Sequence, residues 1–257
     1  FALADLFGVQ GGKSFRGVDE SGSRLGDTQH TYLRLIPELR ARVYGPHIGN
    51  EPPISGERHP VLKGFDETDI LPFGGSLQPL TVNDKVNVLL TFIPSFPMYP
   101  PETAWMREPK TNIPGLILNE SGKGLVAFLP ADIDRRFAND NLPDHGDLLA
   151  NLVRWAAKGD IPLEVEGRGL IDCELYQQAG RIILHVVNLT SAATWRPPVH
   201  ELISIGPLHI KLKLPPGGSA ETLTMLVSGK TEEIKSMDNW IQFVLPSVLD
   251  HEIVLLE

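Results

Sequence analysis

The chain has 257 residues, enough for one large or two modest domains that each bury a hydrophobic core. Hydrophobic residues make up 42% and charged residues 21%, a balance typical of a globular protein rather than a disordered or membrane-spanning one. The formal net charge of −9 argues against nucleic acid or an anionic membrane as a partner, because both require a basic surface. Neutral and cationic ligands remain compatible with this charge.

The single cysteine, Cys173, excludes an intrachain disulfide framework and a cysteine-based zinc site. It lies in a β-rich run without elbow glycines or a helix start beside it, so we interpret it as a structural thiol. We expect neither a metal nor a cofactor. Cysteine usage does not fix the compartment, and we favour a secreted or periplasmic location over the cytoplasm.

The first residues read as the end of a helix, with apolar side chains at Leu3, Leu6 and Phe7 and a stop at Gly8. Because the sequence begins at Phe1 without a signal peptide or a long apolar run, we expect it to be a segment of a longer polypeptide. A Gly- and Ser-rich loop follows, and residues 31–36 alternate as in a strand.

The middle of the chain carries the strongest strand and helix signals. Residues 86–93 form a nearly continuous apolar run, typical of a strand covered on both faces. Prolines forbid regular structure through much of 94–107 and predict a long shaped loop. Residues 116–129 indicate a β-hairpin around Gly122, followed by a polar loop over 131–141. A helix then runs to Ala156, with its start capped by Asp144.

We place a domain boundary near residue 160, because short strand patterns separated by Gly, Pro, Asn and Asp replace the mixed pattern there. The predicted fold class is therefore α/β in residues 1–160 and all-β in residues 161–257. About seven short strands in the second domain predict an antiparallel β-sandwich. The predicted strands are Leu163–Glu166, Ile171–Tyr176, Arg181–Leu189, Ile203–Leu214, Thr222–Val227, Trp240–Leu245 and Glu252–Leu256.

One short motif bears on catalysis. Phe128, Leu129, Pro130 and Ala131 resemble the Phe-His-Pro-Glu of class I glutamine amidotransferases, with the catalytic His and Glu replaced by Leu and Ala. Apolar side chains at these two positions cannot activate a nucleophilic thiol. We therefore predict that this chain carries no catalytic residue of that kind.

The resemblance extends along most of the chain. The first domain resembles the amidotransferase-like trimerisation domain of β-galactosidase-type glycoside hydrolases. The end of the chain resembles the C-terminal β-domain of these enzymes. The first resemblance rests on Phe1–Val9, His59–Gly64, Leu71–Gly75, Pro130–Arg135, Asp144–Gly146 and Arg154–Ala156. The second rests on Pro207–Ile210 and Pro246–Glu252.

This resemblance implies a partial flavodoxin-like, amidotransferase-like domain followed by a β-sandwich. It implies a non-catalytic scaffold that holds a homo-oligomer together. The reaction would be hydrolysis of O-glycosidic bonds by a (β/α)8 barrel with two catalytic carboxylates, located in the parent protein or in a partner chain. Two alternatives remain: a carbohydrate-binding module, and an independent hydrolase that uses acidic residues of the 132–144 region.

Two groups of residues are candidate site residues. The proline-rich loop combines aromatic faces with polar groups suited to a sugar ring, and Trp195 offers a second platform. The same aromatic side chains could instead pack between domains or subunits, and we favour this interpretation over direct contact with a sugar. The loop residues are Tyr99, Glu102, Trp105 and Arg107.

The second group follows a predicted strand end, where open α/β sheets usually place ligands. Its residues are Asp132, Asp134, Arg135, Asp144 and His145. They could line a cleft or bind a hard cation, but their spacing is not that of a calcium loop. We favour salt bridges and helix capping over a metal. A glycosidase would need two paired carboxylates, and the sequence alone pairs none of the available ones.

Overall fold

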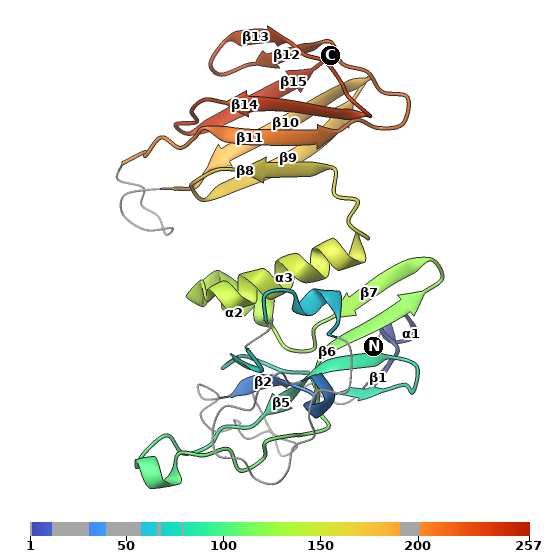
Figure 1. The fold of residues 1–257 in the computed structure, drawn as a ribbon, viewed down its shortest axis with the longest axis vertical. Helices are drawn as coiled ribbons and strands as arrows, with labels where there is room; N and C mark the ends of the chain where they lie inside the picture. Colours follow the sequence, from blue (N-terminus) through green and yellow to red (C-terminus); the bar gives the residue numbers. More distant parts are fainter. Residues whose placement is uncertain (1, 12–30, 40–57, 66–67, 79, 191–200) are drawn as a thin grey trace. The chain divides into compact units, whose positions relative to one another are not determined.

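The computed structural model describes residues 2–11, 31–39, 58–65, 68–78, 80–190 and 201–257. The chain divides into two compact units, Phe1–Asp160 and Ile161–Glu257, which are described separately below (Figure 1). None of the described helices is long and apolar enough to cross a membrane.

The first unit is built on a five-stranded sheet in the order β3-β2-β5-β6-β7, with a two-stranded sheet β1-β4 beside it. All described pairings in both sheets are antiparallel. The strands are β1 (Val9–Gly11), β2 (Tyr32–Leu35), β3 (Ile70–Pro72), β4 (Leu80–Val82), β5 (Asn87–Ile93), β6 (Pro114–Ser121) and β7 (Gly124–Phe128). The helices are α1 (Ala4–Phe7), α2 (Ile133–Asp140) and α3 (Pro143–Ala156), with short 3-10 turns η2 (Pro37–Leu39), η3 (Pro60–Leu62) and η4 (Pro101–Thr103).

Both faces of the five-stranded sheet carry a hydrophobic core. The larger cluster joins strands β2, β5 and β6 to helix α3 through side chains such as Leu33, Leu90 and Leu148, each at most 2% exposed. On β6, Ile117 packs instead with Val9 and Leu80 of the small sheet. Burial on both faces explains why the sequence of β5 is an almost unbroken apolar run.

The first unit mixes helices and strands as predicted, but the described strands contain no parallel ladder of the flavodoxin-like kind. The predicted polar loop over 131–141 is wrong, because residues 133–140 form α2. Its charged side chains stabilise it, since Arg136 pairs with Asp140 one turn away. Asn141 ends the helix in the left-handed conformation, with φ of 51°.

The predicted cap of α3 is also wrong. The residue at the N-cap position is Leu142, and Pro143 occupies the first helical position, where its missing N–H costs nothing. Asp144 lies in the first turn instead of at the N-cap position. Its charge near the positive end of the helix dipole favours the helix start.

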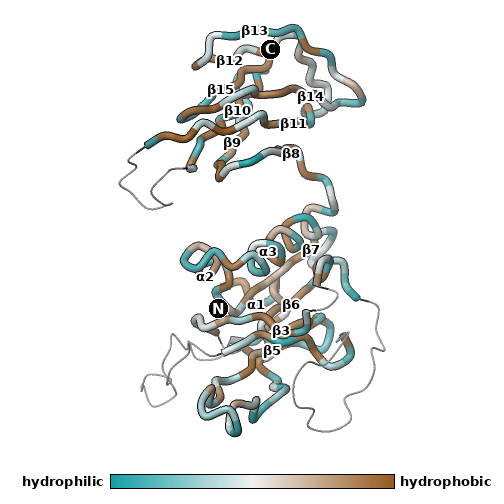
Figure 2. The backbone as a smooth tube through the Cα atoms, turned by 60° about the vertical axis from the view of Figure 1, so that its left-hand side comes forward, coloured by the Kyte–Doolittle hydropathy of each residue, from teal (hydrophilic) through white to brown (hydrophobic). Residues whose placement is uncertain are grey.

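The second unit contains two antiparallel sheets, with strand orders β13-β12-β15-β10-β9 and β14-β11-β8. The strands are β8 (Leu163–Glu166), β9 (Ile171–Gln178), β10 (Arg181–Asn188), β11 (Leu208–Lys213), β12 (Thr222–Met225), β13 (Lys230–Glu233), β14 (Trp240–Leu245) and β15 (His251–Leu256). One core contains side chains from both sheets, including Leu184 and Leu212. Hydropathy alternates along these strands, as the brown and pale stretches of the tube show (Figure 2). The predicted β-rich character is thus confirmed.

Two differences from the predicted strands are the largest in this unit. The strand predicted over 203–214 is shorter, because Pro207 lacks the N–H that a ladder requires and β11 begins only at Leu208. Strand β13 was not predicted, since its residues Lys230–Glu233 are all exposed and mostly charged. Such a composition suits an edge strand, where charge discourages pairing with other chains.

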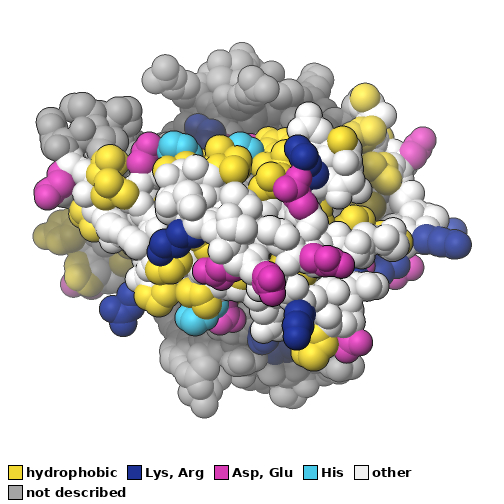
Figure 3. Space-filling model, turned by 90° about the horizontal axis from the view of Figure 1, so that it is seen from above, with side chains coloured by type: hydrophobic (Ala, Val, Ile, Leu, Met, Phe, Trp, Pro, Cys, Tyr) yellow, Lys and Arg dark blue, Asp and Glu magenta, His cyan; other side chains and the backbone are white. Residues whose placement is uncertain are grey.

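Acidic and basic side chains are interspersed on the face of the molecule seen in Figure 3.

A regular turn joins β9 and β10 in the second unit. Gln178 faces Arg181 in the ladder, which leaves Ala179 and Gly180 as a two-residue loop. Their φ angles of 49° and 84° are those of the type I′ turn that matches the twist of a hairpin.

Candidate functional site

The proline-rich loop between β5 and β6 brings two of its four candidate residues together. The guanidinium carbon of Arg107 lies 3.5 Å from the centroid of the Trp105 ring, and its Nη2 donates a hydrogen bond to the carbonyl of Thr103 at 3.1 Å. Arg107 therefore covers one face of the indole and ties the loop to itself. Tyr99 is 85% exposed, and Glu102 is exposed as well. Trp195 lies outside the described residues.

The acidic region after β7 is engaged in structural contacts. Asp132 accepts a hydrogen bond from the backbone N–H of Ser76 at 2.8 Å and one from Nε of Arg135 at 2.6 Å. Asp134 lies exposed on α2. Within the described part of the chain, no three His, Cys, Asp or Glu side chains gather as a metal would require. Asp132 thus fastens the segment after β3 to the start of α2.

His145 is buried in the first unit, at 2% exposure. Its Nε2 lies 2.7 Å from the carbonyl oxygen of Pro72, which accepts a hydrogen bond from the ring N–H. Its Nδ1 has no hydrogen-bond partner among the described residues. His145 therefore links α3 to β3, and it is too enclosed to meet a substrate.

The two positions that the amidotransferase resemblance assigns to catalysis belong to the core. Ala131 is 1% exposed and forms a β-bridge with Leu77. Leu129 is half-buried and packs against the same cluster. A protonatable side chain is absent from both positions, and the cluster against which they pack is hydrophobic.

Two groups that could act as nucleophile or acid in the second unit have unsuitable pKa values. Burial raises the pKa of the Cys173 thiol, and the neighbouring Asp172 carboxylate raises it further, which keeps the thiol protonated. Burial also tends to raise the pKa of Glu252, but hydrogen bonds from the N–H groups of Val227, Ser228 and Ile253 outweigh it, and the net pKa is lowered. A general acid in glycoside hydrolysis requires the opposite direction.

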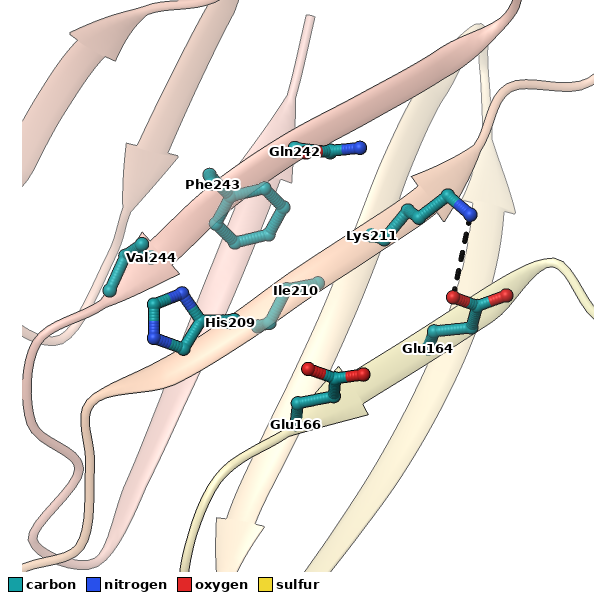
Figure 4. A pocket seen from close by; sticks show the side chains of 8 residues that line it. All are labelled: Glu164, Glu166, His209, Ile210, Lys211, Gln242, Phe243 and Val244. Atoms are coloured by element: carbon teal, nitrogen blue, oxygen red, sulfur yellow. Dashed lines mark hydrogen bonds and ion pairs between the residues drawn. The ribbon is translucent and has the colours of Figure 1, made fainter.

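A shallow groove of about 290 Å³ lies on the outer face of the β14-β11-β8 sheet (Figure 4). Cross-strand pairs line it, with Glu166 opposite His209 and Glu164 opposite Lys211. The Lys211 ammonium lies 3.4 Å from a Glu164 carboxylate oxygen and 4.4 Å from the centroid of the Trp240 ring. The Glu164–Lys211 pair thus brings opposite charges together across the strands and supports the sheet. Sequence reasoning did not single out this face, because its residues read as ordinary solvent-facing positions.

No protein-family model matches the sequence, and no curated protein is significantly similar to it. Solved structures do resemble the fold. The chain superposes on α-L-fucosidase isoenzyme 2 from Paenibacillus thiaminolyticus with a TM-score of 0.57 and 15% identity, over 89% of this chain and 32% of that one.

Two β-galactosidases are also similar. The enzyme from Bacillus circulans sp. alkalophilus gives a TM-score of 0.46 at 13% identity, over 99% of this chain and 25% of that one. The enzyme from Rahnella sp. R3 gives 0.42 at 11% identity, over 98% and 24%. All three are glycoside hydrolases, and the chain spans a third or less of their length. The likeness to the fucosidase shows a shared fold.

Proposed function

We propose that this chain is a non-catalytic, two-domain segment of a glycoside hydrolase that holds a separate catalytic barrel in an oligomer. The observation that carries the proposal is the burial of Ala131, at 1% exposure, where the resembling amidotransferases place a catalytic carboxylate. The fold likeness to the fucosidase supports it, because it covers most of this chain but only a third of the enzyme.

In this proposal the first unit is part of an amidotransferase-like domain of the trimerisation type, and the second is a β-sandwich that follows it. The barrel belongs to the parent protein or to a partner chain. The proline-rich loop contacts another subunit, since it carries three exposed apolar side chains close in sequence: Met98 at 48%, Tyr99 at 85% and Trp105 at 37%. Aromatic residues and Met are enriched in such interfaces.

Light scattering of the full chain, together with a screen against aryl glycosides, tests the proposal. We expect a mass of more than one chain and no hydrolysis by this chain alone. A monomer that hydrolyses a glycoside would overturn both parts. In that case, loss of turnover in Asp132→Ala or Asp134→Ala would identify the independent acidic-residue hydrolase.

A further inference from the structure

A hollow of about 370 Å³ lies in the first unit, where the end of α3, the start of η3 and strands β5 and β6 meet. Trp155 and His59 form one wall, and Leu118, which is 3% exposed, contributes an apolar patch. Three polar side chains, those of Lys85, Asn87 and Glu120, complete the lining together with β6 at Asn119. The volume falls in the range of small-molecule sites, which is roughly 300–1,000 Å³.

The aromatic wall is held in place by its own contacts. The rings of His59 and Trp155 meet edge to face, with centroids 5.3 Å apart and planes at 68°. His59 Nδ1 accepts a hydrogen bond from the backbone N–H of Val61 at 3.3 Å, which places the proton of the neutral ring on Nε2. Burial lowers the pKa of His59, so the ring is neutral at pH 7. The wall therefore offers an uncharged aromatic surface.

The polar lining supplies both hydrogen-bond donors and acceptors. The Asn119 side chain is directed away from Trp155, because neighbouring residues of a strand point to opposite faces and its amide N–H is donated to the carbonyl of Leu6 at 2.8 Å. Asn87 lies opposite Leu118 in the strand pair. Lys85 and Glu120 are exposed and carry opposite charges, so they add donors and acceptors without a net charge.

We infer that this hollow, which we call the Trp155 pocket, binds a neutral pyranose unit of a carbohydrate. A sugar ring has an apolar face that packs on an aromatic side chain, and hydroxyls that both donate and accept. Lys85 and Glu120 carry opposite charges, so the lining gives no net preference to an anionic or a cationic ligand. This inference goes beyond the scaffold role and does not depend on it.

Saturation-transfer difference NMR and calorimetry with the full chain test the pocket. The probes are D-glucose, D-galactose and L-fucose, with D-glucuronate and D-glucosamine as charged comparators and lactose as a model of a glycan end. We expect saturation transfer to at least one neutral sugar, with a Kd on the order of 1 mM. Tighter binding of lactose than of D-galactose would place a glycan end in the pocket.

Three substitutions decide whether the binding is at this place. Trp155→Ala should weaken it by about tenfold or more, and Trp155→Phe by less, because an aromatic face remains. Asn87→Ala removes a polar contact at an exposed position and should also weaken it. Trp240→Ala, which removes an indole from the second unit, is the matched control and should leave the affinity unchanged.

The thermal unfolding of each variant separates loss of binding from loss of folding. If Trp155→Ala unfolds the first unit, the sugar affinity of Asn87→Ala decides whether the pocket is the binding site. Binding that survives both Trp155→Phe and Asn87→Ala unchanged, absence of any binding, or preference for D-glucuronate would overturn the assignment. Light scattering of the same samples reports on the scaffold proposal separately, since the pocket does not involve the proline-rich loop.

Discussion

Asp132 accepts a hydrogen bond from the backbone N–H of Ser76, 56 positions earlier in the chain, at 2.8 Å. The same carboxylate also accepts hydrogen bonds from Arg135. It therefore joins the segment that follows β3 to the start of α2. The contacts of Asp132 therefore give it a structural role, which does not depend on a nearby cleft.

Asp132→Ala should lower the free energy of unfolding by about 1–3 kcal/mol, because it leaves the Ser76 N–H without its charged acceptor. Asp134→Ala, two residues away on an exposed position, is the control and should change stability by less than about 0.5 kcal/mol. Urea unfolding of the two variants measures the difference. Equal effects would contradict the structural role of Asp132.

Glu252 predicts a specific pH dependence. Its folded pKa is lowered, so its contribution to stability is present above the unfolded pKa of about 4.3 and is lost as the pH falls through the folded pKa. Glu252→Gln should therefore destabilise the protein by about 1–3 kcal/mol at pH 7. The difference from the natural chain should shrink as the pH is lowered toward 3.

Urea unfolding of both proteins at several pH values checks this. Glu233→Gln on the exposed strand β13 serves as the control and should show no such convergence. A gap between Glu252→Gln and the natural chain that stays constant into acid would mean that the ionised carboxylate is not the stabilising form.

Substitution of Ala179 should stabilise the turn between β9 and β10. Its φ of 49° lies in the left-handed region, which costs a residue with a Cβ roughly 1–2 kcal/mol. Ala179→Gly removes that cost at the expense of some chain entropy, and Ala179→Asn suits the first position of a type I′ turn. We expect either change to raise the melting temperature. Ala138→Gly, in the exposed part of α2, should lower it by the usual helix penalty.

The exposed apolar side chains of the proline-rich loop predict an effect on assembly. If they contact another subunit, Met98→Ser combined with Tyr99→Ser should shift the mass measured by light scattering toward one chain. The melting temperature of the remaining monomer should show that it is folded. The matched control, Met237→Ser, changes a side chain that is 73% exposed in the second unit and should leave the mass unchanged.

Sequence patterns were sufficient where burial dictates the residue types. Strands β8 and β14 begin and end where alternation predicts, because each places every second side chain in the core of the second unit. Helix α2 escaped detection because charged residues such as Arg136 and Asp140 dominate its sequence and resemble a loop in composition, although Ile133 anchors it in the core. Strand β13 escaped for a similar reason, since both faces of an edge strand can be polar.

The candidate sites were less accessible to sequence reasoning. The proline-rich loop was identified because prolines exclude regular structure, and its pairing of Trp105 with Arg107 lies within three residues. The Trp155 pocket combines side chains from positions 59 to 155, and no local pattern reports such a meeting. Trp155 itself reads as one more apolar residue on the packing face of a helix.

The burial of Ala131 limits how this fold could acquire chemistry. A glutamate placed there would put a carboxylate among apolar side chains, where desolvation favours the neutral acid and costs several kcal/mol. A histidine at the half-buried Leu129 would lose a smaller part of its hydration. Introducing a catalytic pair at these two positions would therefore require changes in the packing around Ala131 as well.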